Sequence, residues 1–295
     1  MKRRVLAVLL AAVCLLSLAG CGGKREKTDG LQIICTVFPP YDFVRAIAPE
    51  ANVSLLLDPG QETHSYEPTP RDIMDIQNCD LFIYVGGESE AWVEDMLGSM
   101  DTPPRTLTLL DCVGVQDEHL HDEHVWTSLQ NAVAIVDKLE DTLCDIGVAD
   151  KDALHTAAQT YTDRLRALDT QFAEAVNNAP RKTLVFGDRF PFRHFADAYG
   201  LTCASAYEGC DHSAEPSAAA VAAIADRVKA EDIPVVLYIE FSNQKMADTL
   251  CEATGAQKRL FHSCHNLTKD ELDSGKTYLS LMTDNLAVLK EALYT

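Results

Sequence analysis

Short apolar runs that alternate with stretches of helical periodicity dominate the first half of the chain. Residues 33–37, 53–57 and 81–85 are β-branched and apolar, and each run has the length of a buried parallel strand. Thr69 can cap a helix and Pro70 fits its first position, so a helix is predicted to begin there. This alternation predicts an α/β lobe with a parallel sheet.

A single long helix is predicted between residues 150 and 178. The segment contains neither Pro nor Gly, and its apolar residues recur at three- and four-residue spacing, as on one face of a helix. At about 1.5 Å per residue the helix is about 40 Å long, and it ends before Pro180. A helix of this length can connect two lobes.

Strand and helix patterns alternate again after this helix. The predicted strands are residues 183–186, 202–206, 235–239 and 259–261, and the predicted helices are residues 192–199, 216–229, 244–254 and 278–294. The predicted fold class is therefore α/β, with two α/β lobes joined by a long connecting helix. Its predicted division is an N-terminal lobe at 31–148, a linking helix at 149–179 and a C-terminal lobe at 180–295.

The first thirty residues have the pattern of an export signal. Three basic residues precede an apolar run, which at about 14 residues is too short to span a bilayer comfortably. The sequence Leu-Ala-Gly-Cys at 18–21 resembles a bacterial lipobox. Residues 1–20 are therefore predicted to be a lipoprotein signal peptide, Cys21 to carry lipid, and residues 21–30 to form a lipidated tether. An extracytoplasmic, membrane-anchored protein is expected.

The balance of charge excludes one class of partner. With 45 acidic and 25 basic residues the net charge is −20, so no nucleic acid partner is expected. The ten cysteines are compatible with export, but Cys14 would leave with the signal and Cys21 would carry lipid. The remaining cysteines allow many pairings, so no disulfide is predicted.

Three motifs follow one another in the first lobe: PPYDF at 39–43, PGQETHSYEPTPRD at 59–72 and CDLFIYVGGESEAW at 79–92. With them the chain, from about Ile33 to the C-terminus, resembles the metal-binding solute-binding lipoproteins of bacterial ABC importers, the zinc and manganese uptake family. The resemblance implies a divalent metal ion in the cleft between the lobes, a cognate ABC permease as partner, and a monomer. It implies capture and release of the metal, so no catalytic residue is expected.

Two histidines of the first lobe are the first candidate ligands. His64 lies in a strand-to-helix loop, where the ligands of parallel sheets collect, and the resemblance makes it the first metal ligand. His124 opens the segment HVWTS, which is similar to the family motif before a helix, and becomes the second ligand. His119 and His121 resemble a shortened mobile His-rich loop of zinc-type members, which implies auxiliary metal recruitment.

The same histidines leave an alternative open. Residues 119–124, HLHDEH, nearly match the H-x-H-x-D-H motif of zinc-dependent hydrolases of the metallo-β-lactamase type, which activate water. Glu123 stands where that motif requires Asp, and the flanking sequence argues against such an enzyme. A further alternative is a surface adhesin on the same fold, which would lack metal-coupled uptake.

The second lobe departs from the family pattern where its first ligand is expected. That position falls on Gly187 or Asp188, at the end of a predicted strand. Asp188 is the candidate ligand, because a carboxylate there would face the cleft. It could equally pair with Arg189 or Arg193, or cap the following helix.

The last ligand position of the family usually holds Asp, and here His262 takes its place. His265 and Glu240 are candidates for an alternative ligand or for a supporting role near the same cleft. The implied ligand set is His64, His124, Asp188 and His262. A set rich in imidazole favours Zn²⁺, with Mn²⁺ as the second choice.

Overall fold

The computed structural model describes the chain in five ranges, residues 30–62, 66–114, 122–148, 150–207 and 216–294. Leu31 to Thr295 gather into one compact unit, so the predicted division of this unit at residues 148 and 180 stays a prediction. Among the described residues, no helix combines the length and apolar character needed to cross a membrane. The predicted signal peptide and Cys21 lie outside the described ranges.

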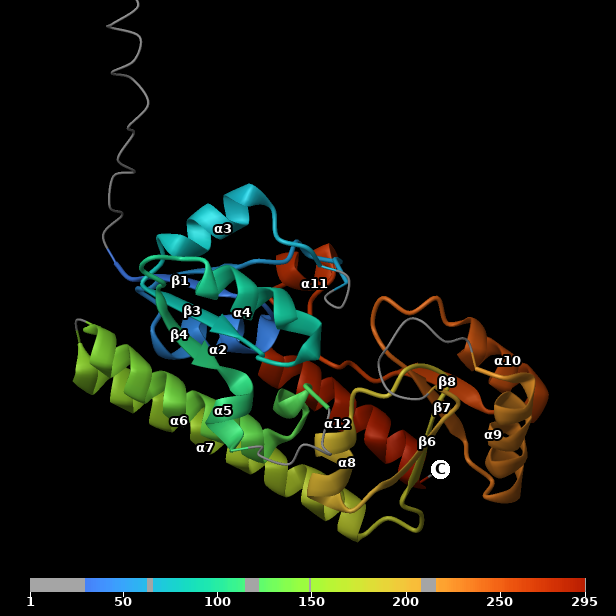
Figure 1. Ribbon diagram of the computed structural model, residues 1–295. Coiled ribbons are helices and arrows are strands. Elements are labelled where there is room, and N and C mark those ends of the chain that lie inside the picture. Colours follow the sequence, from blue (N-terminus) through green and yellow to red (C-terminus); the bar gives the residue numbers. More distant parts are fainter. Residues whose placement is uncertain (1–29, 63–65, 115–121, 149, 208–215, 295) are drawn as a thin grey trace, which may run out of the picture. The chain divides into compact units, whose positions relative to one another are not determined.

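The first sheet consists of four parallel strands in the order β2-β1-β3-β4 (Figure 1). The strands are β1 (Gln32–Cys35), β2 (Asn52–Leu55), β3 (Leu81–Tyr84) and β4 (Arg105–Thr108). The first three confirm the predicted strands. The sequence pattern does not predict β4, because this strand pairs with one neighbour and has no continuous apolar run. The helices of this lobe are α2 (Phe38–Ile47), α3 (Pro70–Gln77), α4 (Ala91–Gly98), α5 (Leu109–Val113) and α6 (Leu129–Ile146).

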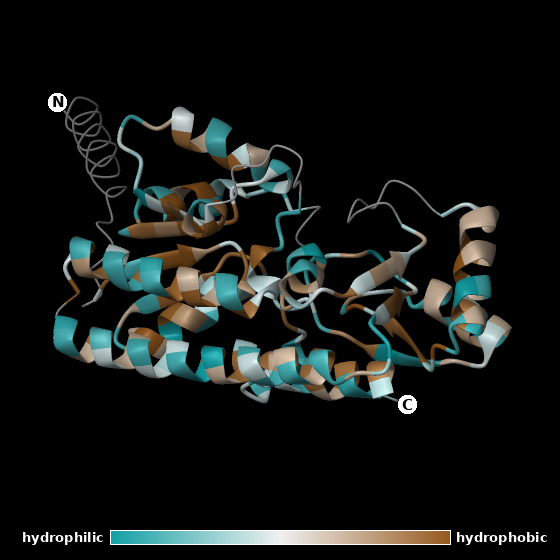
Figure 2. Cartoon of the chain, turned by 90° about the horizontal axis from the view of Figure 1, so that it is seen from below, coloured by the Kyte–Doolittle hydropathy of each residue, from teal (hydrophilic) through white to brown (hydrophobic). Residues whose placement is uncertain are grey.

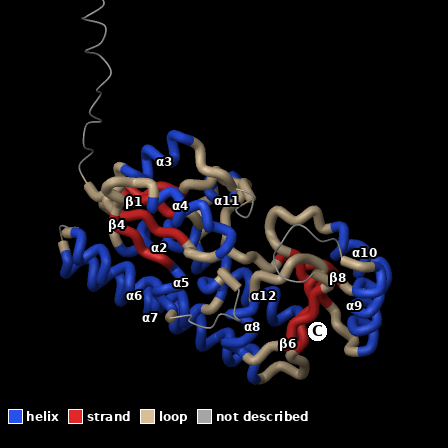
Figure 3. Tube along the Cα trace, viewed as in Figure 1, coloured by secondary structure: helices blue, strands red, loops and turns tan. Residues whose placement is uncertain are grey.

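The second sheet repeats the same topology in the order β6-β5-β7-β8. Its strands are β5 (Thr183–Phe186), β6 (Thr202–Ser205), β7 (Val235–Tyr238) and β8 (Gln257–Leu260). The helices in this part of the chain are α8 (Arg193–Tyr199), α9 (Ala218–Ala230), α10 (Lys245–Thr254), α11 (Lys269–Asp273) and α12 (Tyr278–Tyr294), of which α11 lies beside the first sheet (Figure 1). Figure 3 shows the two sheets as separate groups of strands with helices around them. The strand order reverses between β1 and β3 in the first sheet and between β5 and β7 in the second. Ligands of such sheets bind at the carboxyl ends of the strands around that point.

The long predicted helix is α7 (Lys151–Asn177). The carboxylate of Asp150 caps it by accepting the backbone N–H of Ala153 at 2.9 Å. The helix packs against α2 and α6 on the side of the first sheet and against α8 and α12 on the side of the second. Hydrophobic and hydrophilic residues alternate along the long helices (Figure 2), and the buried apolar residues of α7 belong to one hydrophobic core that includes strands of both sheets. The helix is therefore part of a shared core rather than an exposed link.

A glycine at the end of β5 brings two elements of the second lobe into close contact. A Cβ on Gly187 would lie 2.6 Å from the Cα of Ala247 and 2.8 Å from its backbone nitrogen, at the start of α10. No side chain fits at this position without a shift of the helix. Of the two positions expected to hold a ligand here, Gly187 is therefore the one where a larger residue is excluded.

We expect Gly187→Ala to lower the free energy of unfolding by about 1–3 kcal/mol, because the added methyl group overpacks a backbone contact. Urea unfolding followed by circular dichroism measures the change. Gly98→Ala is the matched control, since a Cβ there meets nothing within 4 Å. Equal stabilities of the Gly187 and Gly98 variants would contradict the close approach.

Candidate metal site

A small pocket lies where loops from both lobes meet. Its walls come from the turn after β2, the residue before the turn Val125–Thr127, and the loops after β5, β7 and β8. The volume open to the centre of a water-sized sphere is about 20 Å³, which suits a single ion or water rather than an organic ligand. The lining residues are Gln61, Glu62, His124, Arg189, Pro191, Ile239, Glu240, Phe241, Ser263, His265 and Asn266.

His124 is buried, with 3% of its surface exposed, and a carboxylate orients its ring. The Oδ1 atom of Asp122 lies 2.6 Å from Nδ1 of His124 and also accepts the backbone N–H of His124 at 2.9 Å. Burial of Asp122 disfavours its charge, but the hydrogen bonds from His124 outweigh burial and lower the pKa of Asp122 to about 2. An ionised carboxylate only accepts, so Nδ1 donates and the neutral ring carries its lone pair on Nε2. This is the usual arrangement of a metal-binding histidine.

Asp122 also contacts the second lobe. Its Oδ2 accepts the backbone N–H of Arg193 at 3.1 Å, and its carbonyl oxygen lies 2.8 Å from Nε2 of His194. Asp122 was not among the residues predicted for the site. Its position offers a signal, since an Asp side chain often accepts the backbone N–H of the residue two positions later, here His124.

His265 faces His124. The two ring centroids are 5.0 Å apart with an interplanar angle of 85°, and the ring of Trp126 lies 5.1 Å from that of His265. The backbone of His265 is held on both sides, since its N–H reaches the carboxylate of Glu240 at 3.3 Å and its carbonyl accepts the N–H of Phe38 at 3.0 Å. His265 therefore stands in the pocket wall in contact with a first-lobe histidine.

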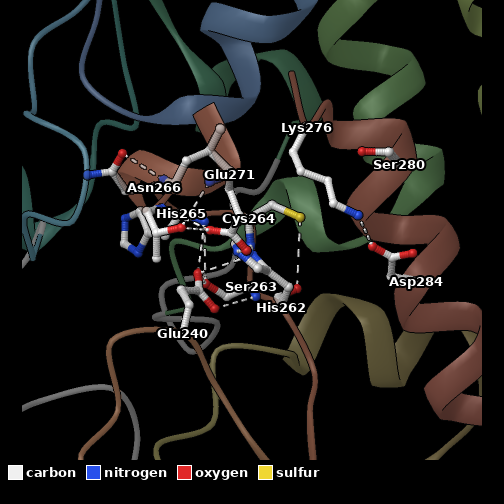
Figure 4. A network of polar contacts seen from close by, with 12 residues as sticks. Glu240, His262, Ser263, Cys264, His265, Asn266, Glu271, Lys276, Ser280 and Asp284 are labelled. Atoms are coloured by element: carbon white, nitrogen blue, oxygen red, sulfur yellow. Dashed lines mark hydrogen bonds and ion pairs between the residues drawn. The ribbon is translucent and has the colours of Figure 1, made fainter. Parts of the chain in front are cut away.

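His262 takes a different direction (Figure 4). Its Nδ1 accepts the backbone N–H of Cys264 at 2.9 Å, and its Nε2 lies 3.5 Å from Oε1 of Glu271 at the start of α11. Burial lowers the pKa of His262, but the carboxylates of Glu240 and Glu271 outweigh it and raise the pKa overall. His262 is 3% exposed, and it is not among the described residues that line the pocket.

Asp188 uses its carboxylate on the backbone. Its Oδ1 accepts the N–H of Arg189 at 2.9 Å and its Oδ2 accepts the N–H of Ile239 at 3.3 Å, which ties the end of β5 to the end of β7. The next residue, Arg189, lines the pocket instead, and its Nη2 lies 3.3 Å from Oε2 of Glu62. Arg189 and Glu62 thus form an ion pair between the lobes, which the sequence reading did not identify.

Glu240 lines the pocket at the end of β7 and supports the segment after β8 (Figure 4). Its carboxylate accepts the backbone N–H of Ser263 at 2.8 Å and the Ser263 hydroxyl at 2.5 Å, in addition to the N–H of His265. These hydrogen bonds fix the backbone that presents the His265 ring.

His64, His119 and His121 lie outside the described residues. Within the described ranges, no group of three or more His, Cys, Asp or Glu side chains is arranged to hold a metal ion. Each described cysteine is a free thiol. Gln61 and Glu62, which precede His64 by only a few residues, line the pocket.

Comparison with known proteins shows the family of this chain. The family model described as "Zinc-uptake complex component A periplasmic" matches residues 33–292. The zinc-binding lipoprotein AdcA of Streptococcus pneumoniae is 31% identical over 97% of this chain, which spans only 60% of the length of AdcA. The high-affinity zinc uptake system protein ZnuA of Bacillus subtilis is 28% identical over 97% of both chains.

A solved structure has the same architecture. The crystal structure of the Zn(II)-bound ZnuA-like domain of Streptococcus pneumoniae AdcA matches with a TM-score of 0.77 and 30% identity. The match covers 90% of this chain and 100% of that domain. The predicted class of two α/β lobes is therefore confirmed, by the described sheets and by this likeness.

Proposed function

Because the chain belongs to the family of periplasmic zinc-uptake complex components A, we propose that it is the substrate-binding component of a metal ABC importer. In this proposal it captures one divalent transition metal ion, Zn²⁺ before Mn²⁺, and delivers the ion to a cognate permease. The observation that carries the proposal is the pair of imidazoles from different lobes, His124 and His265, that pack edge to face and both line a pocket of ionic size.

The proposed ligands are His64, His124 and His265. The carboxylate on Nδ1 of His124 favours metal binding through Nε2, and an imidazole-rich set favours zinc over manganese. Glu62 has a carboxylate in the same pocket wall for a fourth position, whereas the carboxylate of Glu240 already holds the backbone of Ser263 and His265.

Two residues of the sequence-based set receive supporting roles in this proposal. The Asp188 carboxylate already accepts two backbone N–H groups, and the ring of His262 already serves the backbone of Cys264 and pairs with Glu271. We therefore propose that Asp188 and His262 stabilise the loops of the second lobe while His265 binds the metal.

A lipid anchor and two auxiliary histidines complete the proposed receptor. Residues 1–20 would be removed and Cys21 would be lipidated. The lipid would anchor a monomer to the membrane on its extracytoplasmic side, at the cell surface or in the periplasm. His119 and His121 would recruit metal to the site. The protein would perform no catalysis, since a site closed by protein ligands keeps no position for a reacting water.

Neither alternative function gains support from a specific observation. A hydrolase of the metallo-β-lactamase type would use His119, His121 and His124 together with downstream ligands around an open zinc site. The neighbour of His124 in the described pocket is instead His265, from the segment after β8. An adhesin role would need a surface contact with another molecule.

We expect the lipid-free protein to bind one zinc ion per chain in competition with a chromophoric chelator. Free zinc at about 1,000 times the dissociation constant should raise the free energy of unfolding by about 4 kcal/mol, because zinc binds the folded state alone. Manganese at the same concentration should raise it less. Elemental analysis and denaturant unfolding measure both quantities. The absence of any zinc-dependent stabilisation would refute the proposed function.

A further inference from the structure

We propose that Asn266 is a positioning residue that holds the turn leading to His64 and thereby sets how slowly the metal is released. The inference rests on the proposed function for its metal half only. Its structural half, that Asn266 immobilises the turn at 58–61, can be tested without metal.

The Asn266 side chain makes three hydrogen bonds, and only an amide can make all of them. Its Nδ2 donates to the carbonyl oxygens of Asp58 at 2.8 Å and Gln61 at 3.0 Å, while its Oδ1 accepts the N–H of Leu267 at 2.8 Å. The residue is 1% exposed. A carboxylate in its place would direct an acceptor at two carbonyl oxygens.

Two further contacts hold the same turn. Gly60 donates its N–H to the carbonyl of Leu267 at 2.7 Å, and its φ of +87° is a conformation that favours glycine. One residue beyond the turn, Glu62 meets Arg189 of the second lobe. The chain on its way to His64 is thus fixed mainly by residues far away in sequence, from the loops after β5 and β8.

The same short segment also presents His265. Asn266 follows His265 directly, and Ser263 in this segment accepts the indole N–H of Trp126 at 2.8 Å through its carbonyl oxygen. One segment therefore sets the position of the His265 ring relative to His124 and clamps the turn that precedes His64. A site whose ligands are held in advance by such contacts loses its metal more slowly than one whose ligands must be ordered on binding.

Hydrogen exchange of the metal-free full chain tests the structural half. We expect amides in residues 56–62 to exchange at least about tenfold faster in Asn266→Ala and Asn266→Asp than in the wild type, because the turn loses its clamp. Asn285→Ala is the matched control. Asn285 is equally buried and bonds the N–H and carbonyl of His262, but it makes no hydrogen bond to the turn.

Metal release tests the second half. In the Asn266 variants we expect zinc to transfer to excess chelator at least about tenfold faster, while the visible spectrum of the cobalt-loaded protein keeps its intensity because the ligands remain. Asn285→Ala should release zinc within about threefold of the wild-type rate. If the alanine variant does not fold, Asn266→Ser, which keeps one donor, replaces it.

Unchanged exchange in residues 56–62 would overturn the inference, whatever the metal does. Faster exchange together with an unaltered rate of zinc release would overturn the claim that the clamp controls retention. A loss of cobalt absorption without faster exchange in residues 56–62 would make Asn266 a ligand instead of a positioning residue, and would overturn it as well. Failure of the wild type to bind zinc would defeat the proposed function, yet the exchange experiment would still decide on the clamp.

Discussion

Replacement of His265 by asparagine is expected to lower zinc affinity more than about 100-fold, whereas the same change at His262 is expected to lower it less than about tenfold. Loss of a group that merely supports a ligand already costs about 10- to 100-fold, so loss of a ligand should cost more. Asparagine is the replacement because its side-chain oxygen can take over from Nδ1 of His262 as acceptor for the N–H of Cys264. The same replacement at position 265 makes the two variants comparable.

Competition titration with a zinc chelator measures both variants, and thermal unfolding of the metal-free proteins shows whether each is folded. His124→Asn serves as the positive control, since His124 is the proposed ligand whose ring the carboxylate of Asp122 orients. If the His262 variant lost zinc binding and the His265 variant kept it, the assignment based on the family pattern would stand and the one based on pocket geometry would be wrong.

The choice between His262 and His265 shows that the sequence of a loop does not by itself specify which of its side chains enters a pocket. Both follow β8 in the short segment HSCHN at 262–266, where His262 takes the family's last ligand position and His265 is the alternative. Which ring enters the pocket depends on the backbone path, and Cys264 between them has a φ of +61°, an unusual conformation for a side chain of this size. Long-range hydrogen bonds to Glu240, Phe38 and Trp126 stabilise that path, and no local pattern announces them.

Arg189 illustrates the same limit at the end of β5. Sequence reasoning pointed to this loop, because ligands gather where the strand order of a parallel sheet reverses, and residues of the loop line the pocket. It selected Asp188 by chemical type, since a carboxylate can bind metal and a guanidinium cannot. The carboxylate, however, is used by the backbone N–H groups of Arg189 and Ile239, while Arg189 reaches the pocket.

The fold was easier to predict because its signals are local. Apolar runs mark the buried strands β1, β3, β5 and β7, and helical periodicity marks α7 over its whole length. At the start of α3 the predicted cap is present, since the Thr69 hydroxyl accepts the N–H of Asp72. The edge strand β4 lacks such a signal, because half of its residues are exposed and its place depends on pairing with β3.

A tryptophan at the junction of the lobes is expected to carry the largest stability effect of any single side chain near the site. Trp126 is fully buried, its indole N–H donates to the carbonyl of Ser263, and its own carbonyl accepts the hydroxyl of Tyr278 at 2.5 Å. Trp126→Ala should lower the free energy of unfolding by about 3–5 kcal/mol, because it removes a large apolar group and leaves a cavity.

Trp126→Phe separates packing from hydrogen bonding. The phenyl ring restores much of the volume, so the remaining loss of about 1–3 kcal/mol reflects the Ser263 carbonyl that is left without its donor in a buried place. Zinc affinity should also fall in this variant, because Ser263 lies two residues before His265 and the indole ring packs against the rings of His124 and His265. Urea unfolding and chelator competition give the two quantities. Tyr199→Phe is the control, since it removes a hydroxyl that donates to Asp169 at 2.7 Å away from the pocket and should affect zinc affinity much less. A Trp126→Phe protein with wild-type stability and wild-type zinc affinity would show that this contact between the lobes does not help to hold the site.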